Sequence, residues 1–422
     1  MVVDESKANN FVRAEPDRCM QYIHCGRLLT GDTAPIDEAG LLVEDGYVAA
    51  AGPHEEIDVP AEATHIDHSD ATVTPGLIDA HLHLQGVRSM DPFSWVRESS
   101  ELGAARATAD LRALLAAGFT AVRDVGSQTG LGLKTAVEDD TVPGPRVFTS
   151  GRSISQTGGH GDAHYLPYEW ADDRGISTLA DGPAECRKVA RKRIRDGVDC
   201  LKIMTTGGVL SEKDAPSQSQ FTDAEIQAFT EEAHRVGLPV ASHAQGAAGV
   251  KAALENGVDT IEHGFHLDDE ALELFETTDA TFVPTLAIMY RLVTQGDDHG
   301  VPEYGLKKAH TAREAHFEST RRAYEADVPI ALGTDFLGPA LVPHGENALE
   351  AELLVEEIGL SEREAIEAGT RVAAQTVPAS DIGVLEPGAQ ADVLAFETDP
   401  LADIRALREP DAVYKGGEPV AL

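Results

Sequence analysis

The sequence predicts an α/β protein in which a (β/α)8 TIM barrel, residues 74–382, adjoins a small β-sandwich domain. The sandwich is expected to be composite, built from residues 17–73 and 383–422. Two observations predict this fold. The middle of the chain alternates apolar strand-like runs with amphipathic helical stretches, whereas both ends contain only short strand-like runs between turns. A hydrophobic content of 42% in 422 residues supplies enough apolar material for a large core.

The two ends of the chain have the same strand-and-turn pattern. In the N-terminal stretch, Asp45-Gly46 is a hairpin-type turn between two apolar runs. In the C-terminal stretch, apolar runs are separated by glycine- and proline-containing turns such as Pro387-Gly388. Neither stretch has enough strands for a core of its own, so we expect the two to form one domain.

The middle of the chain offers eight strand candidates that end in polar or catalytic-type residues. In order, these strands lead into His81 and His83, Asp124, Arg152, Lys202, His243, His263, Thr285 and Asp335. Helical stretches lie between them; one opens with a capping box at Thr222 and closes at Gly237. An open doubly wound sheet is the alternative, but the glycine-rich dinucleotide loop typical of that fold is not found.

The charge is strongly acidic. With 34 basic and 72 acidic side chains, the net charge is −38, and a polyanion of this kind repels nucleic acid and anionic membranes. The acidic residues are dispersed, which resembles proteins from a salt-rich cytoplasm; attraction of a cationic substrate is the other interpretation. A basic run at 187–195 is interpreted as a solvated or subunit-facing helix rather than a nucleic-acid site, and we expect a homo-oligomer.

Cysteine content and hydropathy bear on the compartment. The four cysteines form no C-x-x-C pair, so neither a disulfide framework nor a cysteine metal site is expected. The first sixteen residues lack the apolar core of a signal peptide, and no apolar run approaches the roughly 20 residues of a membrane span. We therefore expect a cytoplasmic protein.

His81 and His83 are the most informative pair. Residues two apart on a strand point to the same side, so both imidazoles can face one point at the end of a strand. Two neutral histidines there form half of a site for a divalent metal. His243, His263 and Asp335 end later strands, where each alone could be a core histidine or a helix-capping aspartate. Together, on one face of a barrel, they favour a metal site.

Lys202 stands in an otherwise apolar strand, residues 198–204. A lysine buried in a strand is rare unless it is paired, and burial lowers its pKa toward a neutral, reactive amine. Carbon dioxide can convert such an amine to a carbamate whose two oxygens bridge two metals. The alternative is a lysine that extends to the barrel mouth.

This set of residues resembles the amidohydrolase superfamily in its binuclear form with a carboxylated lysine. The segments 201–209, 157–162 and 344–348 resemble its metal-dependent Xaa-Pro dipeptidase and Xaa-Arg carboxypeptidase branch. The resemblance implies two divalent metal ions, expected to be zinc. His81, His83 and Asp335 would bind one, His243 and His263 the other, and the carbamate of Lys202 would bridge them.

The resemblance also implies a function: hydrolysis of the amide bond of dipeptides or N-acyl amino acids, with proline favoured on the C-terminal side. Asp335 would take a proton from the attacking water and pass it to the leaving nitrogen. His160 is a further catalytic candidate, and the candidates for binding the small-molecule or dipeptide substrate are His160, Arg152, His164, Tyr165, Tyr290 and Arg291. The alternatives are an imidazolonepropionase-like cyclic-amide hydrolase or deaminase, and a catalytically silent assembly or binding protein.

Overall fold

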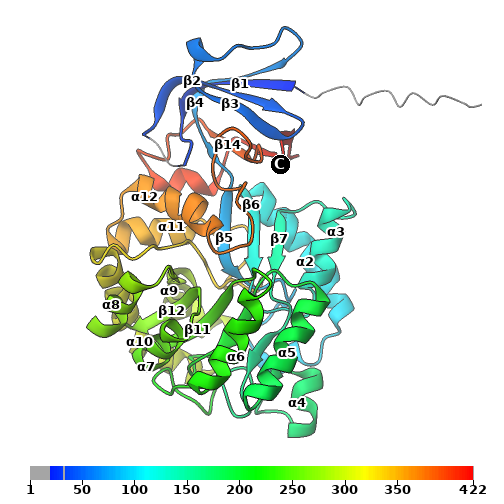
Figure 1. Ribbon diagram of the computed structural model, residues 1–422, viewed down its shortest axis with the longest axis vertical. Coiled ribbons are helices and arrows are strands. Elements are labelled where there is room, and N and C mark those ends of the chain that lie inside the picture. Colours follow the sequence, from blue (N-terminus) through cyan, green and yellow to red (C-terminus); the bar gives the residue numbers. More distant parts are fainter. Residues whose placement is uncertain (1–19, 32–33, 422) are drawn as a thin grey trace, which may run out of the picture.

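The computed structural model describes residues 20–31 and 34–421, and Figure 1 shows a smaller β-rich part above a larger α/β part. Cys19 and residues 17–18 of the predicted β domain lie outside the described residues. None of the described helices is long and apolar enough to cross a membrane.

Strands from both ends of the chain form one seven-stranded sheet in the order β16-β15-β14-β4-β1-β2-β3. Its strands are β1 (Met20–Leu28), β2 (Ile36–Glu44), β3 (Tyr47–Pro53), β4 (Thr64–Pro75), β14 (Val393–Phe396), β15 (Ala412–Lys415) and β16 (Glu418–Pro419). Strand β14 pairs antiparallel with the end of β4, where Leu394 lies opposite Thr74. Apolar side chains of both ends, among them Ile23, Leu41 and Val393, pack in one cluster. The division of the chain into separate domains stays a prediction.

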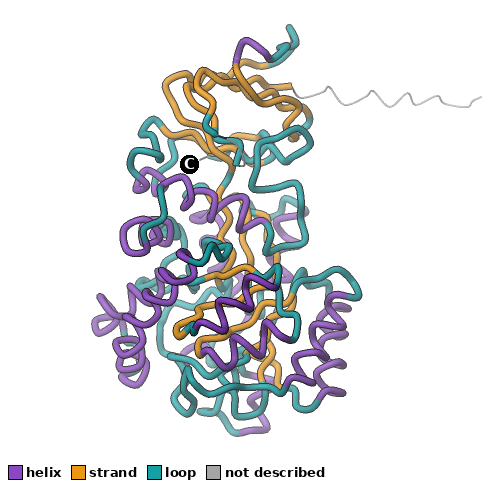
Figure 2. The backbone as a smooth tube through the Cα atoms, turned by 60° about the vertical axis from the view of Figure 1, so that its left-hand side comes forward, coloured by secondary structure: helices purple, strands orange, loops and turns teal. Residues whose placement is uncertain are grey.

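The larger part is built on parallel strands, which Figure 2 shows in orange inside a layer of helices. One sheet has the order β5-β6-β7 and another the order β13-β12-β11-β10-β8-β9. The strands are β5 (Leu77–Leu82), β6 (Phe119–Asp124), β7 (Arg146–Thr149), β8 (Ser153–Ser155), β9 (Ser177–Leu179), β10 (Leu201–Met204), β11 (Val240–Gly246), β12 (Thr260–His266) and β13 (Thr281–Val283). This arrangement is TIM-barrel-like.

The segment 330–335, predicted as the last strand, forms no regular strand; among the described residues this region makes only isolated bridges, Ile330 to Phe282 of β13 and Phe336 to Leu82 of β5. The regular ladder is interrupted because the amides of both Thr334 and Asp335 donate to the carbonyl oxygen of His81.

Helices follow most of the strands. They are α1 (Pro92–Trp95), α2 (Ser100–Ala116), α3 (Gly130–Glu138), α4 (Tyr168–Arg174), α5 (Pro183–Asp196), α6 (Asp223–His234), α7 (Ala247–Glu255), α8 (Asp269–Thr277), α9 (Leu286–Gln295), α10 (Glu303–Glu325), α11 (Leu349–Leu353) and α12 (Glu362–Glu367). Short 3-10 turns are η1 (His54–Glu56), η2 (Gly296–His299) and η5 (Ile404–Arg408), and π-turns are η3 (Leu354–Ile358) and η4 (Ala368–Val372). The predicted capping box at Thr222 is present at the start of α6, where the Glu225 carboxylate accepts the Thr222 amide at 2.7 Å.

Candidate active site

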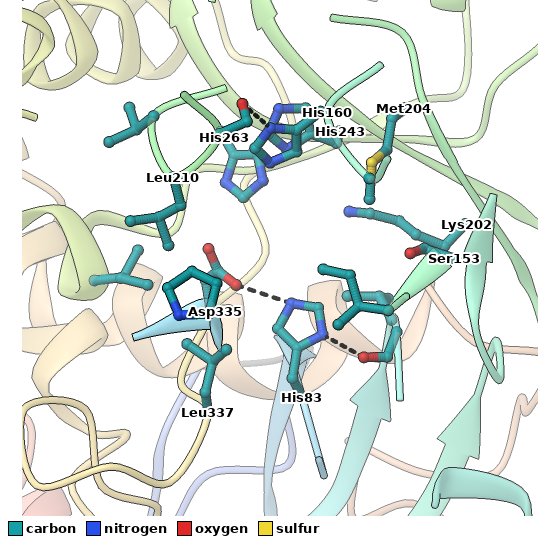
Figure 3. A pocket seen from close by; sticks show the side chains of 18 of the residues that line it. His83, Ser153, His160, Lys202, Met204, Leu210, His243, His263, Asp335 and Leu337 are labelled. Carbon is teal, nitrogen blue, oxygen red and sulfur yellow. Dashed lines mark hydrogen bonds and ion pairs between the residues drawn. The ribbon is translucent and has the colours of Figure 1, made fainter. Parts of the chain in front are cut away.

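A cavity of about 150 Å³ opens at the ends of the parallel strands. Nine of the predicted site residues line it: His81, His83, His160, His164, Tyr165, Lys202, His243, His263 and Asp335. Figure 3 shows the labelled members of this group facing one another around a common space. Strands far apart in the sequence therefore deliver these side chains to one place.

His81 and His83 approach the same carboxylate oxygen from the first strand of this part. Asp335 Oδ1 lies 3.5 Å from His81 Nε2 and 3.0 Å from His83 Nε2. Ligand atoms of His81, His263 and Asp335 all lie within 4.8 Å of one another. Two imidazole nitrogens and a carboxylate at this spacing suit a divalent transition metal.

A fully buried ion pair orients His81. The pair is formed by Arg123 and Glu262, in which Arg123 donates to Glu262 Oε1 at 2.9 Å. His81 Nδ1 donates to the other oxygen, Glu262 Oε2, at 2.6 Å. Both Glu262 and Arg123 have no exposed side-chain surface. Although burial raises the pKa of Glu262, the charges of Arg123 and Lys202 outweigh it and hold that pKa far below its usual range. The ionised carboxylate fixes the tautomer of His81, so that Nε2 is the nitrogen that faces the site.

The other histidines are held in a similar way. His83 Nδ1 donates to the carbonyl oxygen of Gly126 at 2.9 Å, and His263 Nδ1 lies 2.8 Å from the Thr285 hydroxyl. His243 Nε2 lies 3.2 Å from the carbonyl oxygen of Gly207. One nitrogen of each ring is thus engaged by the scaffold, and the other is left for a ligand.

Three residues of the site have left-handed backbones: His263 at φ 76°, Thr285 at φ 57° and Asp335 at φ 58°. Residues other than glycine adopt this conformation at a cost of about 1–3 kcal/mol each, and such residues cluster at functional sites. The strain here accompanies the placement of two candidate ligands and of the threonine that holds one of them.

Lys202 extends from β10 into the same space (Figure 3). Its side chain is buried, and its Nζ has no hydrogen-bond partner among the described residues. Burial lowers the pKa of Lys202 to about 8. A buried amine without a partner is unfavourable in isolation, so this atom fits the carbamate and metal ions that the resemblance implies.

Burial also sets the charge of the remaining donors. It lowers the pKa of His243 and of His263 well below the usual value, so both rings are neutral and able to bind a metal. Burial raises the pKa of Asp335, but hydrogen bonds to His81 and His83 outweigh it and hold this pKa well below its usual range. The site therefore combines the neutral rings of His243 and His263 with an ionised carboxylate. For His83, burial lowers the pKa, but the hydrogen bond and charge of Asp335 outweigh burial and raise it.

His160 lies beside these donors. Its ring stacks on that of His243, with centroids 4.2 Å apart and planes at 19°. Its Nδ1 lies 2.8 Å from the Ser211 hydroxyl. His164 and Tyr165 belong to the same loop; the ring of Tyr165 packs 4.8 Å from that of Phe93, and burial raises its pKa to about 12.

Three predicted substrate residues do not line this cavity. Arg152 donates to the carbonyl oxygens of Gly175 and Ser177, at 2.7 and 2.5 Å. Arg291 pairs with Glu346, and Tyr290 packs against the apolar core. The sequence placed all three after strands, but their side chains support neighbouring backbone and helices instead.

Other cavity residues were not predicted. Most are apolar or aromatic, and they come from loops and from α1, α9, α10 and β12: Val87, Trp95, Val209, Leu210, Phe265, Ile288, Met289, Leu292, Tyr304 and Leu337. In sequence these positions are indistinguishable from core residues. Among the described lining residues, Lys202 is the only lysine and there is no arginine. The cavity therefore combines a polar floor with apolar walls.

The basic run predicted to form a charge-paired helix lies on α5. Arg187 and Arg191 both pair with Glu232 of α6, at 3.1 and 2.8 Å. These pairs tie the two helices together and account for part of the basic charge.

The profile of the Amidohydrolase family matches residues 72–420. The chain belongs to this family. The predicted resemblance to the amidohydrolase superfamily is thereby confirmed. Membership of this family, together with the relatives described next, shows that the protein is a hydrolase acting on amide bonds.

Individual relatives cover nearly the whole chain. Ochratoxinase of Aspergillus niger is 33% identical over 419 residues, covering 94% of this chain and 85% of that protein. Its crystal structure has a TM-score of 0.87 and covers 95% of both chains at 31% identity. A Xaa-Pro dipeptidase structure with methionine bound in its active site has a TM-score of 0.85 at 31% identity, covering 96% of this chain and all of that one. Imidazolonepropionase of Salinispora tropica is 27% identical, with 85% of this chain and 86% of that protein covered.

Proposed function

We propose that this amidohydrolase is a binuclear metal enzyme that cleaves the amide bond of dipeptides or N-acyl amino acids, with Xaa-Pro dipeptides as the leading substrates. The observation that carries the proposal is the arrangement around Lys202. A buried amine that has no hydrogen-bond partner among the described residues faces a space that the four candidate ligand histidines and Asp335 also line. A mononuclear site would leave this amine without a role.

The proposed ligand assignment keeps the sequence prediction. His81, His83 and Asp335 would hold one divalent ion, His243 and His263 the other, and a carbamate on Lys202 would join them. Zinc is the expected ion, because three or four imidazole and carboxylate ligands suit it. When bound, the two ions lower the pKa of a water and polarise the amide carbonyl.

The chain's own groups would complete the reaction. Asp335, within 3.0 Å of His83 Nε2, is placed to take the proton of the attacking water and to deliver it to the leaving nitrogen. Because the described cavity lining has no arginine, donors from His164 and Tyr165 are the candidates to meet the substrate carboxylate, and His160 would contact another polar group of the substrate. The apolar walls would exclude water from the reacting amide.

The relatives support an amide substrate without deciding which one. Ochratoxinase and a Xaa-Pro dipeptidase both align along almost the whole chain at similar identity. Proline on the C-terminal side remains our leading choice because segments 157–162, 201–209 and 344–348 resemble the dipeptidase branch.

A hydrolysis screen tests this proposal. The zinc- or manganese-loaded protein is assayed at high salt against Xaa-Pro dipeptides, other dipeptides and N-acyl amino acids. We expect turnover of at least one C-terminal proline substrate, and Lys202→Ala should abolish it. Activity confined to other amides would remove the proline assignment, and no turnover of any amide would remove the proposed function.

The similarity to imidazolonepropionase favours a second candidate, a cyclic-amide hydrolase or deaminase. Such an enzyme would work with one metal ion and would not need Lys202. Metal content therefore separates the candidates: two ions per chain favour the first, one favours the second. Partner binding by a metal-loaded but inactive protein would favour the silent assembly protein.

Four finer expectations complete the proposal. We infer that the parallel strands close into a barrel, with the bridges of Ile330 and Phe336 as support. We also infer that the terminal sheet belongs to a separate β-sandwich domain, that the chain forms homo-oligomers, and that it works in a salt-rich cytoplasm. The dispersed charge of −38 supports the last of these.

A further inference from the structure

A chain of hydrogen bonds runs from His160 into the loop that follows β10. The Ser211 hydroxyl donates to Asp214 Oδ1, and its oxygen lies 2.8 Å from His160 Nδ1. Because the hydroxyl hydrogen is directed to the carboxylate, the hydroxyl oxygen can only accept at its other side. His160 Nδ1 must then carry the proton, which leaves Nε2 as the nitrogen available in the cavity.

Asp214 is fixed by further donors. The Gly208 amide donates to its Oδ1 at 3.1 Å, and the Gln220 side-chain amide donates to its Oδ2 at 3.2 Å. The oxygen of the same Gln220 side chain accepts the backbone amide of His160 at 3.0 Å. Every contact of the Asp214 carboxylate is therefore with a donor, and the carboxylate is held against rotation.

Lys308 of α10 binds the backbone of the loop that follows β10. Its Nζ donates to the carbonyl oxygens of Gly208, Ser211 and Asp214, at 3.0, 2.5 and 2.6 Å. Three points of the loop are thus tied to one ammonium group. We call these four residues, Gly208, Ser211, Asp214 and Lys308, the brace.

The His160 ring is confined on both faces. A Cβ at Gly208 would lie 2.2 Å from His160 Cε1, so the ring rests directly on the backbone of that glycine. The ring also stacks on His243 at 4.2 Å. These contacts prevent the ring from tilting, and the hydrogen bond of Nδ1 with Ser211 prevents it from flipping.

We propose that Asp214, acting through Ser211, is a positioning residue that sets the tautomer of His160. Nδ1 keeps its proton toward Ser211, and Nε2 is presented to the substrate. The kinetic consequence rests on the proposed amide hydrolysis, but the tautomer does not. No bond is formed or broken in this role; the brace determines which ring nitrogen the substrate meets.

Asp214→Asn weakens the brace. The side-chain oxygen of the new residue can still accept from Gly208 and Ser211, but a neutral amide holds the hydroxyl hydrogen less strongly than a carboxylate does. The hydroxyl hydrogen can then also turn toward His160 Nδ1, in which case the ring proton moves to Nε2. Nitrogen-15 NMR of the histidine-labelled, zinc-loaded protein distinguishes the two tautomers, since protonated and unprotonated ring nitrogens resonate far apart. We expect His160 to be protonated at Nδ1 in the parent and to show an added share protonated at Nε2 in the variant. Metal content should not change, and kcat should fall with the loss of the Nδ1-protonated form, by up to roughly 10²-fold, as expected for a misplaced proton-transfer or hydrogen-bonding group.

Asp181→Asn is the matched control. Asp181 accepts hydrogen bonds from the backbone amide and the hydroxyl of Thr157, at 3.0 and 2.6 Å. It therefore supports the loop that carries His160 without contacting the His160 ring. Its substitution should leave the tautomer unchanged. Should Asp214→Asn fail to fold, Ser211→Ala serves in its place and should yield a mixture of tautomers.

Protonation of Nε2 in the parent, or the same ratio of tautomers in the parent and in Asp214→Asn, would overturn the proposal. A changed ratio in a protein that hydrolyses no amide would uphold the brace and remove only the proposed function.

Discussion

Two groups of histidines lie in different parts of the molecule, and one of them lines the candidate active site. In the terminal sheet, the rings of His24 and His54 lie 4.5 Å apart, and Tyr22 contacts both His54 and His65. At the cavity, the rings of His81, His83, His243 and His263 lie at comparable separations of 4.7 to 5.4 Å. Ring spacing alone does not distinguish the two.

The difference lies in burial and in the carboxylate that lies among the ring nitrogens. Every candidate ligand histidine is buried or nearly so and has one nitrogen engaged by a carboxylate, hydroxyl or carbonyl oxygen. In the terminal cluster, His54 and His65 are exposed, and His24 Nε2 is buried with no hydrogen-bond partner in the described part of the chain. Among the described residues, only His81, His263 and Asp335 bring three ligand atoms within 4.8 Å. A metal site therefore depends on oriented rings around an ionised carboxylate.

The largest effect is expected from Asp335→Asn. The amide cannot accept a proton, and it weakens the ligand set, so kcat should fall by roughly 10²–10⁴-fold. Steady-state kinetics with the best substrate of the screen measure this. Asp67→Asn, which makes the same change beside the terminal histidines, should leave kcat unchanged; equal losses in the two variants would break the comparison.

Glu262→Gln tests the orientation of His81. The amide cannot balance the charge of buried Arg123, and breaking a buried pair of this kind costs about 3–5 kcal/mol. Loss of the carboxylate partner should also weaken metal binding roughly 10–100-fold. Denaturant unfolding and competition with a chelator measure the two effects. Unchanged zinc affinity would mean that Glu262 does not orient His81.

Glu350 supports the site from further away and should affect the pH dependence of stability. It accepts the amides of Leu286 and Ala287, next to the threonine that holds His263, at 2.9 and 2.6 Å. Burial raises its pKa to about 8. The folded state therefore keeps a proton that the unfolded chain loses near pH 4.5, and this contribution to stability declines as pH rises toward 8. In Glu350→Gln, the free energy of unfolding should decline less steeply with pH, by at most about 1.4 kcal/mol per pH unit. Urea unfolding between pH 5 and pH 8 measures this slope. The same slope in the parent and in the variant would contradict the raised pKa of Glu350.

The smallest effect is expected from His54→Asn in the terminal cluster. The variant loses the hydrogen bond to the Tyr22 hydroxyl, which should cost about 1 kcal/mol of the free energy of unfolding. Activity and metal content should equal those of the parent. A loss of bound zinc in this variant would show that the terminal histidines contribute to metal binding.

The sequence predicted the ligand candidates because strand ends carry them in a fixed pattern. His81, His83, Lys202, His243, His263 and Asp335 each follow an apolar run, and parallel strands bring such ends together. The family and the parallel α/β architecture were predictable for the same reason.

The supporting residues could not be predicted. Glu350 and Lys308 act from helices remote in sequence, and Asp214 looks like an ordinary loop aspartate. Arg152 does not line the cavity, because a strand-end position does not fix where a long side chain extends. The cavity walls depend on how the loops pack, which has no periodic signature in the sequence.

The central claim is that Lys202 joins two metal ions. It is tested most directly by metal analysis of the protein reconstituted with zinc and ¹³C-bicarbonate, together with carbon-13 NMR. We predict two zinc ions per chain and a carbamate carbon signal that disappears in Lys202→Ala, with loss of metal and activity. One ion per chain, no carbamate signal and full activity in Lys202→Ala would contradict the account.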